Sequence, residues 1–176
     1  MLQTTPQAAA APRGTASDQG RGGRAGGPRP GTKRGMEMRI LGIDYGDART
    51  GLSVSDPSGF LAGSPSVIHE WNYDKLVDKL VAFVSENRIE EIVLGWPKNM
   101  DGTAGPRAEK CEALAETLRA RTGLPVVLWD ERRTTVAAHE ILHQSGKKMK
   151  KHRQTVDAVA AALILQGYLD YRRSRA

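Results

Sequence analysis

The sequence has little cysteine, no long apolar run and almost no acid in its first part. Cys111 is the single cysteine among 176 residues, which excludes an internal disulfide and any metal site built on paired cysteines. No stretch approaches the ~18 consecutive apolar residues that a transmembrane helix needs. The amino terminus also lacks the basic-then-apolar pattern of a secretion signal. The sequence therefore predicts a cytoplasmic protein without a membrane span.

The net charge of +6 is unevenly distributed. Most of it falls in residues 1–35, where six Lys and Arg side chains stand against Asp18 alone, and residues 36–176 are nearly neutral. A second basic group without an acid lies near the end of the chain and comprises Lys147, Lys148, Lys150, Lys151 and Arg153. Such a run is a candidate contact for nucleic-acid phosphates. A solvated loop is the alternative interpretation.

The chain divides into a tail and one domain. Residues 1–35 are rich in Gly, Pro, Ala and Arg and show no periodicity, so we expect a disordered basic tail. A translation start at Met36 or Met38 is an equal alternative. Residues 36–176 have the length and patterning of a single domain with one sizeable core.

Hydrophobic periodicity predicts an α/β fold. Strands are expected at 38–44, 51–55, 60–68, 91–95 and 125–130. Helices are expected at 72–87, 105–121, 133–144 and 154–170. Three hairpin-linked strands followed by strands with helical crossovers make a mixed five-stranded sheet flanked by helices.

Several acids follow strands or lie on an apolar helix face. Asp44 ends the first strand, where a carboxylate is costly unless it meets a cation or hydrogen-bond donors. Gly46 lies in the turn that follows, where a missing side chain would let a phosphate approach. Asp130 and Glu131 end the last strand, and neighbours on a strand point to opposite faces. Both acids can therefore enter one site only if the strand has already ended.

Asp157 is the most informative acid. Helical geometry places it on one face with Ala161, Ile164 and Tyr168, so it begins a core-facing stripe. An acid in the first turn of a helix also favours the helix dipole, but that effect does not require the buried side. Carboxylates from three separate segments can hold one or two hard cations such as Mg²⁺ or Mn²⁺. Two such ions about 3.5–4 Å apart support phosphodiester cleavage.

Four segments together resemble one family. They are ILGIDYGDARTGLSVSD (40–56), GWPKNMDGT (95–103), DERRTT (130–135) and VDAVAAALILQGYL (156–169). In this order they resemble the signatures of the RuvX/YqgF family of Holliday junction resolvases and pre-16S ribosomal RNA nucleases. The resemblance covers residues 38–170. Trp96 and Arg133 depart from the family pattern, and neither is an acid position.

The resemblance implies an RNase H-like fold and a metal-dependent nuclease acting on RNA or branched DNA, with 5′ end maturation of pre-16S rRNA as the leading role. It implies Asp44, Glu131 and Asp157 as metal ligands, with Asp130 as the alternative to Glu131. Candidate substrate contacts are Gly46, Asn99, Asp101, Arg132 and the basic group Lys147–Arg153. A junction resolvase would further need a two-fold homodimer.

Three other functions fit the sequence less well. His139 and His143 match the HExxH zinc-protease motif, but they lie nearly opposite the apolar face of their predicted helix. An RNA-binding assembly factor without catalysis would gain nothing from Asp44 and Asp157 beside phosphates. Actin-like sugar kinases share the Asp44-x-Gly46 pattern, but their fold needs two such domains.

Overall fold

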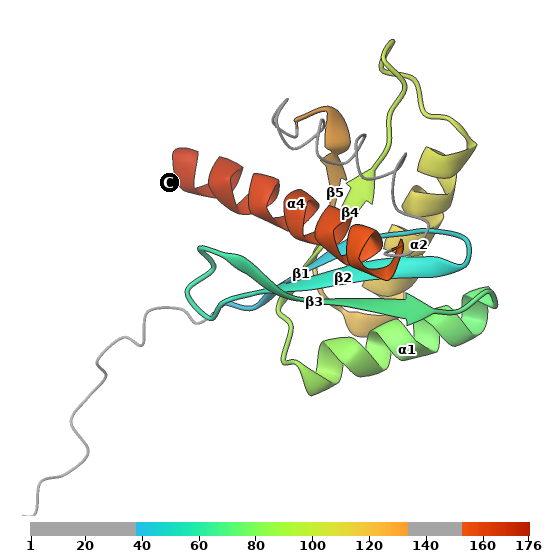
Figure 1. Cartoon of the computed structure of the whole chain (residues 1–176), viewed down its shortest axis with the longest axis horizontal. Coiled ribbons are helices and arrows are strands. Elements are labelled where there is room, and N and C mark those ends of the chain that lie inside the picture. Colours follow the sequence, from blue (N-terminus) through green and yellow to red (C-terminus); the bar gives the residue numbers. More distant parts are fainter. Residues whose placement is uncertain (1–37, 134–152) are drawn as a thin grey trace, which may run out of the picture. The chain divides into compact units, whose positions relative to one another are not determined.

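The computed structural model describes residues 38–133 and 153–176, with side chains in the second segment from Asp157 onward. Five strands form one sheet in the order β3-β2-β1-β4-β5 (Figure 1). β1 (Ile40–Asp44), β2 (Arg49–Ser55) and β3 (Ala62–His69) are antiparallel neighbours. β4 (Glu91–Trp96) and β5 (Val126–Asp130) continue the sheet parallel to β1. The predicted mixed five-stranded sheet is confirmed.

Helices cover both faces of the sheet. α1 (Tyr73–Glu86) and α2 (Pro106–Thr122) share one apolar core with the sheet, and α4 (Arg153–Ser174) packs on the opposite face (Figure 1). The Asn72 carboxamide accepts a hydrogen bond from the Lys75 N–H at 3.0 Å, so it caps α1 as the sequence predicts. Gly123, with a φ of +70°, ends α2 in the left-handed conformation.

Side chains along β1 point alternately to the two faces of the sheet. Leu41 and Ile43 join the core under α1 and α2, whereas Ile40 joins the cluster under α4. Asp44 therefore emerges on the α4 face, at the carboxyl end of the strand. The strand thus delivers a carboxylate to the side from which Asp157 arrives.

The start of α4 lies directly on the sheet. A Cβ atom at Gly51 of β2 would stand 2.0 Å from the Asp157 carbonyl oxygen, so only glycine allows this approach. Gly51 pairs with Asp44 across the β1–β2 ladder. The packing therefore places the first turns of α4 beside the end of β1.

Hydrogen bonds to one buried carboxylate hold the C-terminal half of α4 on the sheet. Glu91, only 6% exposed, accepts hydrogen bonds from the Tyr168 hydroxyl and from Arg172, the latter at 2.9 Å. Burial, followed by the Glu91 contact, raises the pKa of Tyr168. A buried carboxylate with two donors is satisfied, so this group holds α4 on β4.

Several predictions fall outside the described residues. They concern the tail (1–35), the helix at 133–144 with His139 and His143, and the basic side chains Lys147, Lys148, Lys150 and Lys151. Arg153 opens α4, but its side chain is not described. No helix within 38–133 and 153–176 is long and apolar enough to cross a membrane.

Candidate active site

The site lies at one edge of the sheet. β1, β4 and β5 are parallel, so their carboxyl ends, at Asp44, Trp96 and Asp130, meet at the same edge. The first described turns of α4 reach this edge through Gly51. Three segments far apart in the sequence thus bring their acids together.

The negative charge of Asp157 acts on Asp44. Burial is the largest cause that raises the pKa of Asp44, and the negative charge of Asp157 raises it further, while Arg107 opposes both. The buried Oδ2 of Asp157 accepts no hydrogen bond from any described residue. Among the described residues, Arg49 forms an ion pair with Asp157, and its Nε lies 3.7 Å from Oδ2, too far for a hydrogen bond. Asp157 Oδ2 therefore has a counter-charge nearby but no hydrogen-bond donor in the described part of the chain.

Glu131 is the third carboxylate at this edge. β5 ends at Asp130, and Glu131 begins the short 3₁₀ helix η1 (Glu131–Arg133), so the strand's alternation no longer applies. Burial, and next the charge of Asp44, raise the pKa of Glu131 to about 7. Glu131 and Asp44 therefore share one electrostatic environment.

Asp130 has a different partner. Its two carboxylate oxygens accept hydrogen bonds from Arg132 Nε at 2.9 and 3.1 Å and from Nη2 at 2.6 Å. The Arg132 contact is also the first cause that lowers the pKa of Asp130. This pairing engages the carboxylate that the sequence left as an alternative to Glu131, and it occupies Arg132, a predicted substrate contact.

The loop after β4 is a tight turn. Gly102 has a φ of +87°, and the Asn99 side chain donates to Thr103 Oγ1 at 2.9 Å. Asp101 accepts from the Thr103 N–H at 2.9 Å, and hydrogen bonds to Thr103 lower its pKa. Arg132 reaches the Asn99 carbonyl oxygen at 3.5 Å, which links this loop to η1. Asn99 and Asp101 thus have structural roles, and their contact with substrate stays a prediction.

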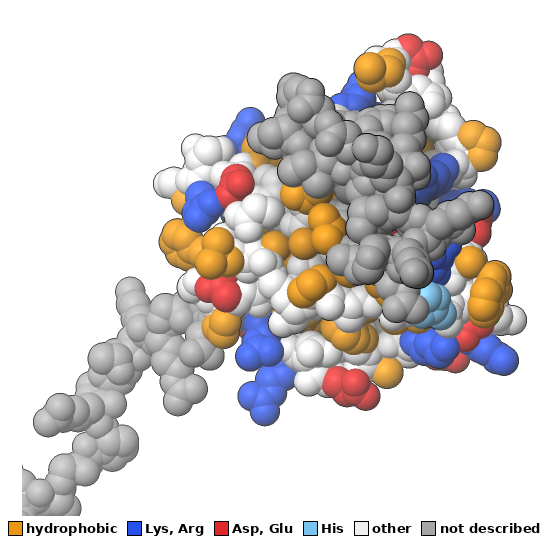
Figure 2. Space-filling view, viewed as in Figure 1, with side chains coloured by type: hydrophobic (Ala, Val, Ile, Leu, Met, Phe, Trp, Pro, Cys, Tyr) orange, Lys and Arg blue, Asp and Glu red, His pale blue; other side chains and the backbone are white. Residues whose placement is uncertain are grey.

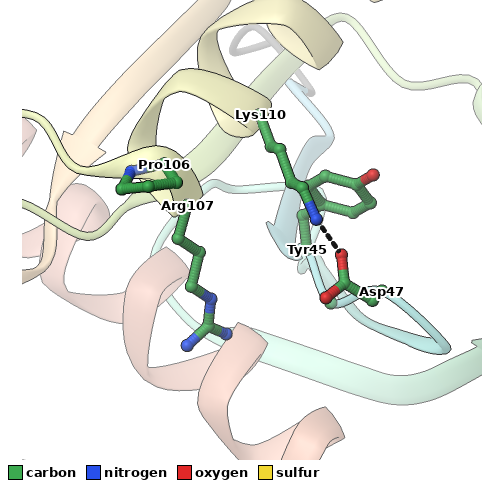
Figure 3. A pocket seen from close by; sticks show the side chains of 6 residues that line it. Tyr45, Asp47, Pro106, Arg107 and Lys110 are labelled. Atoms are coloured by element: carbon green, nitrogen blue, oxygen red, sulfur yellow. Dashed lines mark hydrogen bonds and ion pairs between the residues drawn. The ribbon is translucent and has the colours of Figure 1, made fainter.

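The turn between β1 and β2 forms one wall of a pocket of about 370 Å³, drawn in Figure 3. The start of α2 forms the other wall, and Lys110 of α2 contacts Asp47 of the turn at 2.6 Å. A Cβ atom at Gly46 would lie 2.4 Å from the Arg49 carbonyl oxygen. The turn's own backbone therefore requires this glycine, and contact of Gly46 with a substrate phosphate stays a prediction. The pocket-lining residues are Tyr45, Gly46, Asp47, Pro106, Arg107 and Lys110.

The acids have the chemistry that a divalent cation needs, but they are not arranged as a complete set of ligands. Among the residues that the structure describes, no group of three or more His, Cys, Asp or Glu side chains is arranged to hold a metal ion. Carboxylate oxygens are nevertheless the ligands that Mg²⁺ and Mn²⁺ prefer. The raised pKa values of Asp44 and Glu131 and the unpartnered Oδ2 of Asp157 are the features that a cation would relieve.

Sequence reasoning missed two arginines near these acids. Arg49 approaches Asp157, and Arg107 lowers the pKa of both Asp44 and Glu131. One signal for Arg107 was available. Arg107 follows Pro106 in the first turn of α2, where the helix dipole disfavours a cation. An arginine at such a position contributes little to the stability of the helix, which favours a functional role.

Comparison with known proteins identifies the family. A model of the RuvX family, described as Holliday junction resolvase, matches residues 38–171. A protein of Listeria monocytogenes, provisionally named pre-16S rRNA nuclease, is 44% identical over 139 residues, which cover 76% of this chain and 98% of the relative. One from Halothermothrix orenii with the same name is 42% identical over 135 residues, covering 77% and 96%.

The fold has a counterpart among solved structures. Thermus thermophilus RuvC, in complex with a Holliday junction, superposes with a TM-score of 0.53 at 16% identity, covering 79% of this chain and 98% of RuvC. This likeness confirms the RNase H-like fold that the sequence motifs imply. Because the family model matches well over half of the chain and the relatives exceed 40% identity, the chain belongs to the RuvX family of nucleases.

Proposed function

We propose that this protein is a metal-dependent nuclease that hydrolyses phosphodiester bonds during 5′ end maturation of pre-16S rRNA. The observation that carries the proposal is that the charge of Asp157 acts on Asp44 and the charge of Asp44 acts on Glu131, while the buried Oδ2 of Asp157 accepts no hydrogen bond from any described residue. The names of the bacterial relatives support the choice of substrate. Such a substrate would place the enzyme in the cytoplasm.

Asp44 holds the central position in this proposal, because the charge of Asp157 raises its pKa and its own charge raises the pKa of Glu131. It would ligand Mg²⁺ or Mn²⁺, in a site of two ions, with Glu131 on one side and Asp157 on the other. When bound, the ions supply Lewis acidity, which lowers the pKa of the attacking water and stabilises charge on the leaving oxygen.

Other residues would hold the substrate. The pairing of Asp130 with Arg132 fixes η1, and Arg132 in turn contacts the loop that carries Asn99. Because Glu131 begins η1, this pairing helps to fix the position of its carboxylate. The basic group Lys147–Arg153 would grip the flanking phosphates, which makes affinity fall steeply with salt.

Cleavage of branched DNA is the second candidate, favoured by the family description as Holliday junction resolvase. A resolvase makes paired cuts in a two-fold substrate, so that function would call for a homodimer. The same residues would perform the chemistry, because the carboxylate site acts on the phosphodiester rather than on the sugar.

Cleavage of two labelled substrates tests the proposal. Wild type and Asp44→Asn are incubated with Mn²⁺ and either a pre-16S rRNA 5′ segment or a four-way DNA junction. Cutting of the RNA by wild type alone is expected. Paired cuts confined to the junction would assign the function to recombination. Equal activity of the two proteins, or tight binding without any cleavage, would overturn the nuclease proposal in favour of an RNA-binding assembly factor.

A further inference from the structure

The pocket beside Asp44 contains two cations with different surroundings. Lys110 is paired with Asp47 at 2.6 Å, and this contact lowers the pKa of Asp47 and raises that of Lys110. Arg107 is exposed, and it forms no hydrogen bond or ion pair with any residue in the described part of the chain. In Figure 3 Lys110 bends toward Asp47, whereas the Arg107 side chain extends away from that pair. None of the five N–H donors of Arg107 is therefore used by a residue that the structure describes.

Arg107 lines the pocket from the first turn of α2. The same pocket is lined by Tyr45 and Gly46, which directly follow Asp44 in the chain. A molecule in this pocket would therefore adjoin whatever is bound over Asp44.

Stability does not account for Arg107. A cation in the first turn of a helix opposes the helix dipole, and an exposed guanidinium without an ion pair to any described residue gains little from that part of the fold. The pocket volume of about 370 Å³ lies within the ~300–1,000 Å³ range of ligand sites. The space-filling view shows blue Lys and Arg side chains at the right of the molecule, over the region where Figure 1 places the β1–β2 turn and α2 (Figure 2).

From these features, and resting on the proposed nuclease function, we propose that the pocket between the β1–β2 turn and α2 binds the nucleotide adjacent to the scissile bond. Arg107 contacts its phosphate through a bidentate hydrogen bond, the geometry that guanidinium offers to phosphate oxygens. The Asp47–Lys110 pair closes the pocket on one side and leaves Arg107 as the phosphate contact. The ligand is a nucleic-acid phosphodiester from either RNA or branched DNA.

Binding in an inactive background tests this assignment. Asp44→Asn, Asp44→Asn/Arg107→Ala and Asp44→Asn/Arg107→Lys are titrated with the RNA segment and with the four-way junction over a salt series. Arg121→Ala in the same background is the matched control, because Arg121 lies near the other end of α2 and pairs with Asp78 at 2.8 Å. Thermal unfolding checks that every variant is folded.

Removal of Arg107 should weaken binding about tenfold. It should also reduce the slope of log affinity against log salt by about 0.7–0.9, the loss of one phosphate contact. Arg107→Lys should keep the slope and recover part of the affinity, since it retains the charge but loses the bidentate geometry. Arg121→Ala should change neither quantity. The substrate that shows the effect identifies whether RNA or branched DNA occupies the pocket.

Unchanged affinity and slope in the Arg107→Ala protein, for both substrates, would overturn the inference, and so would binding of neither substrate by Asp44→Asn. This failure is separate from that of the proposed function. If the enzyme with an intact Asp44 cuts RNA but Arg107→Ala binds normally, only the pocket assignment is wrong. If Arg107→Ala loses one phosphate contact while no protein cleaves either substrate, the pocket is right and the nuclease proposal fails.

Discussion

The carboxylate of Glu131 lies directly over Gly95 of β4, where a Cβ atom would stand 2.8 Å from Glu131 Oε1. Glu131 follows β5, the edge strand beside β4, so its side chain reaches back across the neighbouring strand. The missing side chain at Gly95 is what makes room for that reach. Ile164 of α4 closes the same space, with its Cδ1 atom 2.6 Å from the position of that Cβ atom.

Gly95→Ala should therefore displace Glu131 and reduce cleavage at least tenfold, because a shift of about 1 Å in a catalytic group can cost 10²-fold. Gly63→Ala on edge strand β3 is the matched control, since a Cβ there meets only Val54 O at an ordinary 3.7 Å. Single-turnover cleavage rates and thermal unfolding of both proteins measure the effect. A fully active Gly95→Ala enzyme would show that Glu131 does not need this position.

The stability of the metal-free protein should fall as pH rises through the range set by Glu131. The pKa of this carboxyl is raised from 4.5 to about 7, so the folded state holds the proton more tightly than the unfolded state. Stability from this group is present below pH 4.5 and is lost as pH approaches and passes 7. Glu131→Gln should remove that loss and exceed wild type by up to about 3 kcal/mol at pH 8, with little difference near pH 4.

Chemical unfolding of wild type and Glu131→Gln at pH 4, 6 and 8, with a chelator present, measures this difference. Parallel curves for the two proteins across that range would contradict the burial of the Glu131 carboxylate beside Asp44.

The neighbouring acids Asp130 and Glu131 should differ in the type of defect they cause. Asp130→Asn weakens the pairing with Arg132, so we expect a modest loss of cleavage, several-fold, together with a weaker hold on the loop at Asn99. Glu131→Gln removes a proposed metal ligand and should lower the cleavage rate by 10²-fold or more. Cleavage rates of the two variants with Mn²⁺ test this difference. A larger defect in Asp130→Asn than in Glu131→Gln would make Asp130 the metal ligand instead.

Local patterns predicted the framework of this site well. The apolar run at Ile40–Ile43 and the helical spacing from Leu76 to Val84 are local features of the chain, so the strand and the helix formed where expected. The burial of Cys111 as a small helix residue and the core-facing stripe of Ala161 and Ile164 behind Asp157 follow from the same periodicity. These features need no knowledge of what they pack against.

The arrangement within the site depended on tertiary structure. Whether Asp130 or Glu131 turns toward Asp44 depends on the residue at which β5 ends, and the pattern VVLWDE does not mark that residue. Gly46 was interpreted as an opening for phosphate, yet the Arg49 carbonyl oxygen, brought close by the turn, requires the glycine. Arg107 belongs to no apolar pattern, and only the folded chain brings it near the acids.

Divalent cations should stabilise the wild-type protein through Asp44. A ligand that binds only the folded state raises stability by ~2.7 kcal/mol at a hundred times its dissociation constant. The unfolding temperature of the wild type should therefore rise with increasing Mn²⁺ and fall again when a chelator is added. In Asp44→Asn this rise should be largely lost. Equal stabilisation of the two proteins would place the cation elsewhere on the molecule.

The central claim is that Asp44, Glu131 and Asp157 act as one metal-dependent cleavage site. The most direct test is the single-turnover rate of pre-rRNA cleavage by Asp44→Asn, Glu131→Gln and Asp157→Asn, each shown to be folded, with saturating Mn²⁺. Asp170→Asn is the matched control, an exposed acid on the same helix as Asp157 that contacts Gln166 and Arg173. The account predicts a loss of 10²-fold or more in each of the three variants and wild-type rates in the control. Cleavage at the wild-type rate by any one of the three would contradict it.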